Sequence, residues 1–305
     1  MWPKSYAEHI AEAERRLTTF DARTVDSPWG TIEYVERGAE IPLLVSHGIA
    51  GGHDAAVVTA EVWAGDGFRV IGPSRFGYFR SALPTGAHPA LQADAFAALL
   101  DALGADRAAV LGFSAGGPPA IQFALRHPDR TLALVLASAH LPTSPYVKLP
   151  AWLYRTLFSE RLFWLLKAYA PRRLARIMGV PKGFRASPEE WRSIRSLMDG
   201  LFPIRPRREG MVQDGILTNP DVEGYPLEEI GVPTLIIHSA DDTLAHYETA
   251  PRAAARIPGA RFVTVDRGGH IFAGREALVR KEIGGFIRSC VPGETVPEVV
   301  RSGVG

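Results

Sequence analysis

The chain has 305 residues, of which 46% are apolar and 22% charged, and its net charge at neutral pH is +1. This is the composition of a globular protein that is long enough for one large domain with an insertion, or for two domains. The near-zero net charge argues against a nucleic-acid partner, because nucleic acids select basic surfaces. The single cysteine, Cys290, excludes an intrachain disulfide and indicates a reducing, cytoplasmic location.

The first twenty residues predict an amphipathic helix rather than a secretory signal. Apolar residues recur at steps of three and four, at Trp2, Tyr6, Ile10, Ala13 and Leu17. The charged residues lie off this stripe, at Glu8, Glu12, Arg15 and Arg16. We expect this helix to dock on the core or on another subunit. Attachment to a membrane surface is the less favoured alternative, because acidic residues share its polar face.

Short apolar runs alternate with helical patterns in two separate parts of the chain. The first part contains expected strands at 31–37, 42–46, 69–71, 108–111 and 132–137, and expected helices at 90–103 and 117–126. The second part contains expected strands at 233–238 and 261–265, and expected helices at 247–257 and 276–290. Repeated strand–helix–strand units predict an α/β fold with a mostly parallel sheet and helices on both faces. Ligands of such sheets bind at the carboxyl ends of the strands.

Residues 141–225 interrupt this alternation and predict a helical insertion rich in aromatic and basic residues. The insertion holds 14 Lys plus Arg and 8 Asp plus Glu, a net charge of +6. Such a cover over a binding site could admit an apolar group and attract an anionic one; the plainer interpretation is a solvated basic surface over an apolar core. The most apolar stretch, 149–169, contains four charged residues, so we expect no stable membrane span.

The most informative stretch is Gly112-Phe113-Ser114-Ala115-Gly116, between an apolar strand and a helix. A serine between a strand end and a helix start must occupy a very tight turn, and glycines two positions to either side let neighbouring backbone approach. The serine hydroxyl is then exposed, and the helix N-terminus behind it favours developing negative charge. This is the physical logic of a nucleophile elbow; the alternative is an ordinary strand–helix turn with an incidental serine.

A serine hydroxyl is a weak nucleophile and needs a base, which in turn needs a group that orients it. His270 follows two glycines just after the last expected strand, and Asp241 and Asp242 follow the strand before it. Taken singly, each of these residues could be structural. The residues themselves do not decide between Asp241 and Asp242.

The order Ser114, Asp242, His270 at consecutive strand ends resembles the α/β-hydrolase superfamily, over about residues 31–290. The resemblance implies a core formed by 1–140 and 226–305, with 141–225 as a helical cap inserted after the sixth strand. It implies Asp242 as the acid of the triad, because Asp242 lies three residues after the position usually held by glycine. It also implies that the backbone N–H groups of Ile49 and Ala115 form the oxyanion hole.

Three positions are compared with the family pattern: the loop at 74–81, the nucleophile and the residue after the histidine. The loop at 74–81 keeps Gly77 and Ser81 but carries aromatic residues at 76, 78 and 79, which are expected to shape a pocket or to pack in the core. Ser114 stands where dehalogenases and epoxide hydrolases of this superfamily carry Asp. C–C bond hydrolases resemble the chain more closely but often have Trp after the histidine, where this chain has Ile271.

The sequence therefore predicts a serine hydrolase that cleaves a carboxylic ester or related acyl compound through Ser114, Asp242 and His270. A C–C bond hydrolase and an acyltransferase or perhydrolase with the same triad remain alternatives, and so does a small-molecule receptor on the same fold. No cofactor or metal is expected, because no helical His-x-x-x-His pair occurs and residues 112–117 lack the lysine of a phosphate loop. The expected partner is a small acyl substrate; the oligomeric state is not predicted.

Overall fold

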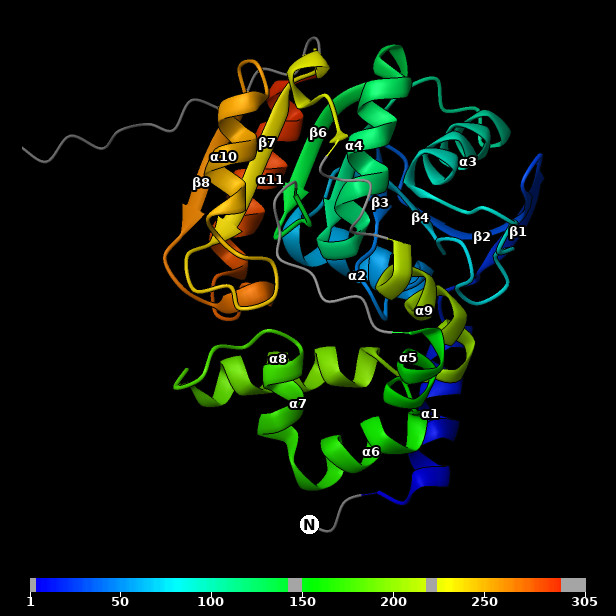
Figure 1. Ribbon diagram of the computed structural model, residues 1–305, viewed down its shortest axis with the longest axis vertical. Coiled ribbons are helices and arrows are strands. Elements are labelled where there is room, and N and C mark those ends of the chain that lie inside the picture. Colours follow the sequence, from blue (N-terminus) through cyan, green and yellow to red (C-terminus); the bar gives the residue numbers. More distant parts are fainter. Residues whose placement is uncertain (1–3, 142–149, 218–223, 292–305) are drawn as a thin grey trace, which may run out of the picture.

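The computed structural model describes residues 4–141, 150–217 and 224–291, and its centre is an eight-stranded mixed sheet (Figure 1). The strand order is β1-β2-β4-β3-β5-β6-β7-β8, in which β1 and β2 are antiparallel to their neighbours and the other strands are parallel. The strands are β1 (Arg23–Ser27), β2 (Gly30–Arg37), β3 (Ile41–Ser46), β4 (Phe68–Pro73), β5 (Ala108–Phe113), β6 (Thr131–Ala137), β7 (Thr234–Ser239) and β8 (Arg261–Val265). The predicted α/β class and mostly parallel sheet are confirmed.

Helices cover both faces of the sheet and bury its apolar side chains in two separate clusters. One cluster joins the sheet to α3 (Pro89–Ala102), α4 (Gly117–Arg126) and α10 (Thr249–Arg256). The other joins it to α2 (His53–Trp63) and α11 (Glu276–Ser289). Because a parallel sheet is buried on both faces, its strands consist almost entirely of apolar residues, as β5 and β6 do.

A helical insertion follows β6, as predicted, and forms a separate layer beyond the carboxyl ends of the parallel strands (Figure 1). Its helices are α5 (Ala151–Leu157), α6 (Glu160–Tyr169), α7 (Pro171–Ile177), α8 (Pro188–Gly200) and α9 (Arg208–Leu217). A capping box begins α8: Ser187 accepts from the Glu190 N–H, and the Glu190 carboxylate accepts from the Ser187 N–H.

The amphipathic helix predicted at the start of the chain is α1 (Tyr6–Thr18), and it packs beside the insertion (Figure 1). The Tyr6 hydroxyl donates to Glu160 over 2.7 Å, and the ring of His9 lies edge-on to Phe202, 4.4 Å between centroids. The Arg16 guanidinium reaches both the Phe202 carbonyl and Asp54 of α2. The predicted docking of this helix on the body of the protein is confirmed.

Two elements escaped prediction. The edge strand β1 is short and mostly exposed, so it carries no apolar alternation. Helix α2 buries residues on several sides, His53, Asp54 and Trp63 among them, and therefore shows no clear polar face.

Within residues 4–141, 150–217 and 224–291, no helix is long and apolar enough to cross a membrane.

Candidate active site

Ser114 lies in the sharp turn between β5 and α4, and its backbone is in the left-handed region at φ 51°. A non-glycine residue in this region is strained by about 1 kcal/mol or more and persists only where its surroundings hold it. Gly116 makes the turn possible, because a Cβ on it would lie 1.9 Å from the Ser46 carbonyl oxygen at the end of β3. The Ser114 carbonyl accepts the His140 N–H over 2.9 Å, which fixes the turn to the end of β6. The strand–turn–helix context predicted for Ser114 is therefore present.

His270 and Asp242 form a buried hydrogen-bonded pair at the ends of β8 and β7. Nδ1 of His270 donates to Oδ2 of Asp242 over 2.8 Å, so its Nε2 is left free to accept a proton. The His270 ring also packs against Phe113, the residue before Ser114, with 5.1 Å between ring centroids. The structure thus brings together the regions of all three predicted triad residues, which lie far apart in the sequence.

Asp242 is held as an acceptor from several directions. Its Oδ1 accepts the Leu244 and Ala245 N–H groups at 2.8 and 3.0 Å. Burial alone would raise the pKa of the Asp242 carboxyl, but the imidazoles of His270 and His238 hold that pKa well below its usual range. The carboxylate is therefore ionised at neutral pH and can orient the His270 ring.

The neighbouring aspartate serves a different structural purpose. Oδ1 of Asp241 accepts the Gly269 N–H over 2.8 Å and the Ser239 hydroxyl over 2.7 Å. Asp241 thus secures the loop that carries His270, while Asp242 contacts the imidazole itself. The geometry selects Asp242 as the partner of His270, in agreement with the resemblance; its catalytic role stays a prediction.

The insertion contacts the His270 loop directly. The His270 N–H donates to the Gly179 carbonyl, just after α7, over 3.1 Å. A Cβ on Gly179 would lie 2.3 Å from the His270 Cβ, so only glycine fits there without displacement. The helical layer therefore supports the loop of the candidate base as well as covering the strand ends.

The predicted oxyanion donors lie on two segments at the same edge of the sheet. Ala115 is buried next to Ser114, while Ile49 stands in the loop after β3 with 40% of its surface exposed. Ala50 has φ 61°, and the Gly51 N–H donates to the Gly48 carbonyl to close a tight turn. A Cβ on Gly48 would lie 3.1 Å from the Ser114 Cβ, so the two segments touch. Their roles in binding an oxyanion stay predictions.

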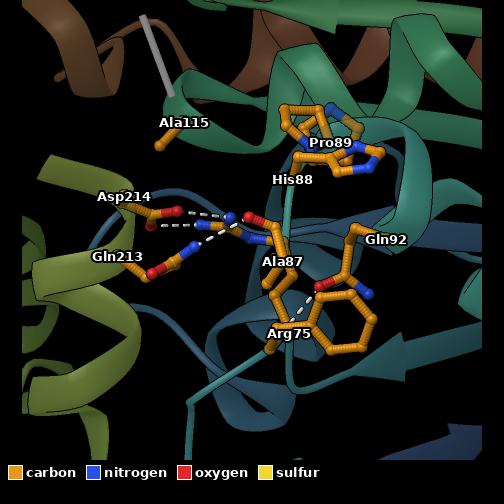
Figure 2. Close-up of a pocket in the computed structure, with 10 residues that line it drawn as sticks. Arg75, Ala87, His88, Pro89, Gln92, Ala115, Gln213 and Asp214 are labelled. Atoms are coloured by element: carbon orange, nitrogen blue, oxygen red, sulfur yellow. Dashed lines mark hydrogen bonds and ion pairs between the residues drawn. The ribbon is translucent and has the colours of Figure 1, made fainter. Parts of the chain in front are cut away.

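A small cavity adjoins Ala115 (Figure 2). Its volume of about 40 Å³ is room for a few water-sized groups. Arg75 and Asp214 form a bidentate ion pair on its wall at 2.7 and 2.5 Å, and the Gln213 amide donates to the Ala87 carbonyl. A cavity of this size would suit a short group better than a long hydrocarbon chain.

The loop at 74–81 joins this wall to the loop after β3, residues 47–52. The Arg75 N–H donates to Nε2 of His47 over 3.0 Å, and the Arg75 side chain donates to the His47 carbonyl over 2.8 Å. Tyr78 is fully buried and donates to Asp214 over 2.6 Å, Phe76 lines the cavity, and Phe79 packs under Arg207. The expectation that these aromatic residues shape a pocket or pack in the core is confirmed: Phe76 lines the cavity and Tyr78 is fully buried. Nothing in the sequence predicts the ion pair of Arg75 with Asp214 or that of Arg207 with Asp54.

His140 is a further histidine in this region, and no described residue accepts or donates at its Nδ1. Burial, reinforced by the charge of His270, lowers its pKa from 6.5 to about 4. His140 is therefore neutral at physiological pH.

This low pKa predicts a loss of stability in mild acid. A histidine whose pKa is lower in the folded state favours folding above pH 6.5 and ceases to do so as the pH falls towards 4. We expect the free energy of unfolding to fall between these values and to fall less steeply in His140→Gln. Denaturant titrations at several pH values measure this; the exposed His246→Gln is the matched control. Parallel pH profiles for His140→Gln and the native chain would contradict the assignment.

Comparisons with known proteins agree with this geometry. The family model described as alpha/beta hydrolase fold matches residues 41–274. The uncharacterized hydrolase YcgS of Bacillus subtilis is 30% identical over 270 residues, which is 83% of this chain and 93% of that protein. A 2-hydroxy-6-oxononadienedioate/2-hydroxy-6-oxononatrienedioate hydrolase of Paraburkholderia phymatum is 28% identical, over 78% of this chain and 84% of that protein.

Solved structures show the same architecture. An alpha/beta hydrolase fold protein from Nakamurella multipartita superimposes with a TM-score of 0.74 at 30% identity, covering 88% of this chain and 99% of that one. The esterase EaEST of Exiguobacterium antarcticum has a TM-score of 0.70 at 22% identity, covering 86% and 98%. The protein is thus a hydrolase with a doubly covered α/β sheet and a helical insertion. It belongs to the α/β-hydrolase fold family.

Proposed function

We propose that this protein is a serine hydrolase that cleaves a carboxylic ester or a related acyl compound through an acyl-enzyme. The observation that carries the proposal is the buried His270–Asp242 pair, 2.8 Å long, beside the strained Ser114 turn. The pair leaves Nε2 of His270 as the only ring nitrogen able to take a proton, which is the state a general base requires.

The proposed reaction proceeds in two steps. His270 removes the Ser114 proton as the hydroxyl oxygen attacks the substrate carbonyl, and the Ile49 and Ala115 N–H groups stabilise the oxyanion. His270 then returns the proton to the leaving alcohol, and an acyl-enzyme remains on Ser114. Water, deprotonated by His270, releases the acid and regenerates the hydroxyl. Asp242 remains ionised throughout and stabilises the transient imidazolium.

The experiment that tests the proposal is a burst assay with p-nitrophenyl acetate, combined with labelling by a fluorophosphonate probe. We expect rapid release of one equivalent of p-nitrophenol, followed by slower turnover, and covalent labelling of Ser114. Mass spectrometry of the labelled peptide locates the adduct. Absence of labelling in a folded, native chain would favour a small-molecule receptor on this fold instead.

A C–C bond hydrolase is the second candidate, because one relative carries that activity in its name. The same triad would serve a substrate whose leaving group is a stabilised carbanion. We would incubate the protein with a 2-hydroxy-6-oxo dienoic acid and measure the loss of that compound by its absorbance. Its consumption separates this activity from esterase activity. An acyltransferase or perhydrolase would instead be revealed by transfer of the acetyl group to an added alcohol or to peroxide.

We also propose that residues 1–140 and 226–305 act as the catalytic core and that residues 141–225 act as a cap over the strand ends. The support is the contact between Gly179 and His270, which places the insertion against the candidate base. The lone Cys290 supports a cytoplasmic location.

A further inference from the structure

Arg207 is the most deeply buried charged side chain among the described residues of the insertion. It lies in a short 3-10 turn, Arg205–Arg207, immediately before α9, and its exposed fraction is 0%. Its guanidinium stands over the Phe79 ring, 4.5 Å from the ring centroid. A buried arginine is costly to desolvate unless all its N–H groups find acceptors, so its partners indicate what the side chain is there to hold.

Those partners lie in three places. Nε donates to the Pro203 carbonyl of the insertion over 3.0 Å, and the terminal nitrogens bind Asp54 and the segment of residues 47–52, here called the oxyanion segment. Nη1 donates to the Gly51 carbonyl over 2.6 Å and approaches the Ala50 carbonyl at 3.3 Å. Nη1 and Nη2 also bind the two oxygens of Asp54, in the first turn of α2, at 3.0 and 2.8 Å. One side chain from the insertion thus spans the end of the oxyanion segment and the start of the helix that follows it.

The segment needs such support because its backbone is strained. Ala50 is held at φ 61°, in the left-handed region that a non-glycine residue adopts only where its surroundings hold it. A loop that turns N–H groups towards an oxyanion must direct some of its carbonyls elsewhere, and those carbonyls need donors when they are buried. The Arg207 guanidinium supplies donors for two successive carbonyls, at Ala50 and Gly51.

We propose that Arg207 is a positioning residue that fixes the oxyanion segment, so that the oxyanion hole is complete only when the insertion is docked on the core. This inference rests on the proposed function, since it assigns the Ile49 N–H a role in catalysis. Arg207 itself does not touch the reacting atoms. It acts through the carbonyls of residues 50 and 51, one and two positions beyond Ile49.

Arg207 is paired with a carboxylate, Asp54, that it shares with Arg16. Burial alone would raise the pKa of the Asp54 carboxyl, but Arg207 and Arg16 hold it well below its usual range. Arg16, from α1, reaches the same carboxylate at 3.1 Å but makes no hydrogen bond to residues 47–52. The two arginines therefore share one acid, while Arg207 alone of the two also holds the oxyanion segment.

The decisive variant removes the contacts of the Arg207 guanidinium without leaving a buried charge. Arg207→Met alone would leave Asp54 short of a partner, so we combine it with Asp54→Asn, which removes the charge and keeps the size of the side chain. The double variant is expected to fold, with a circular dichroism spectrum like that of the native chain. Its kcat for p-nitrophenyl acetate should fall about 100-fold, with KM changed less than about threefold, as for loss of an oxyanion donor.

Two further variants separate positioning from general stabilisation. Arg207→Lys keeps a donor for one carbonyl but cannot form the bidentate pair, so an intermediate loss of about tenfold in kcat is expected. Arg16→Met removes the other charge on Asp54 and leaves the carbonyl contacts intact. It should lower thermal stability while kcat stays within about twofold of the native value.

The outcomes are distinct from those that test the proposed function. If the native chain neither hydrolyses the ester nor reacts with fluorophosphonate, the proposed function fails. If the native chain is active and the folded double variant has the same kcat, Arg207 is only a structural residue and the inference fails. The inference also fails if Arg16→Met reduces kcat as much as the double variant, because pairing of Asp54 would then account for the loss.

Discussion

Replacing Ser114 with alanine should lower kcat for p-nitrophenyl acetate by on the order of 10⁶-fold, with little change in stability. The expected size reflects the loss of the nucleophile itself, because neither His270 nor the oxyanion donors can form an acyl-enzyme without the hydroxyl. Alanine also removes only one oxygen from a turn whose backbone contacts, such as the Ser114 carbonyl with the His140 N–H, stay in place. Steady-state and burst kinetics, with circular dichroism as the folding check, measure both effects.

A matched control is Ser46→Ala, at the end of the neighbouring strand β3. Ser46 is fully buried, and its hydroxyl has no hydrogen-bond partner among the described residues, so its loss should leave burst amplitude and kcat close to native. Retention of the burst by Ser114→Ala would remove Ser114 from the reaction and with it the proposed acyl-enzyme.

Replacing Asp242 with asparagine should lower kcat by about 10⁴-fold while the protein remains folded. An asparagine keeps an oxygen for the Leu244 and Ala245 N–H groups, so the loop is retained. Its NH₂ group would face Nδ1 of His270 and favour the tautomer that carries the proton on Nε2. That tautomer cannot accept the Ser114 proton, so the base is lost although the ring stays in place.

Asp241→Asn is the matched control for Asp242→Asn. The two aspartates are adjacent in the chain, and the same change of charge is made in both. Asp241 binds the Gly268 and Gly269 N–H groups and not the imidazole, so we expect a loss in kcat within about tenfold. Equal losses in the two variants would contradict the assignment of Asp242 as the partner of His270.

The parts of the site that could be predicted from sequence are those encoded locally. The Ser114 turn needs small residues at fixed offsets between an apolar strand and a helix, and all of these lie within ten positions. His270 and the aspartates were identified because each follows an apolar strand of a parallel sheet. The choice of Asp242 over Asp241 came from the family resemblance alone, since adjacent residues of the same chemistry cannot be separated without knowing which way each side chain points.

The parts that could not be predicted are the long-range polar contacts. Arg75 pairs with Asp214 across 139 positions, and Arg207 with Asp54 across 153. In the sequence Arg207 is one of three arginines at 205, 207 and 208, and nothing local distinguishes the buried one from its neighbours. Helix α2 was missed for a related reason: it is covered on several sides, so burial erased the periodicity that reveals a surface helix.

The close approach of Gly179 to His270 has a consequence for protein engineering. Exchanging the whole insertion for one from another hydrolase would bring a foreign backbone against the histidine loop, and any residue with a side chain at that point would displace it. Chimeras that preserve residues 178–181 and diversify only the more distant helices should therefore retain turnover more often than complete transplants. A library screen that compares the two designs would measure how far substrate preference in this chain is modular.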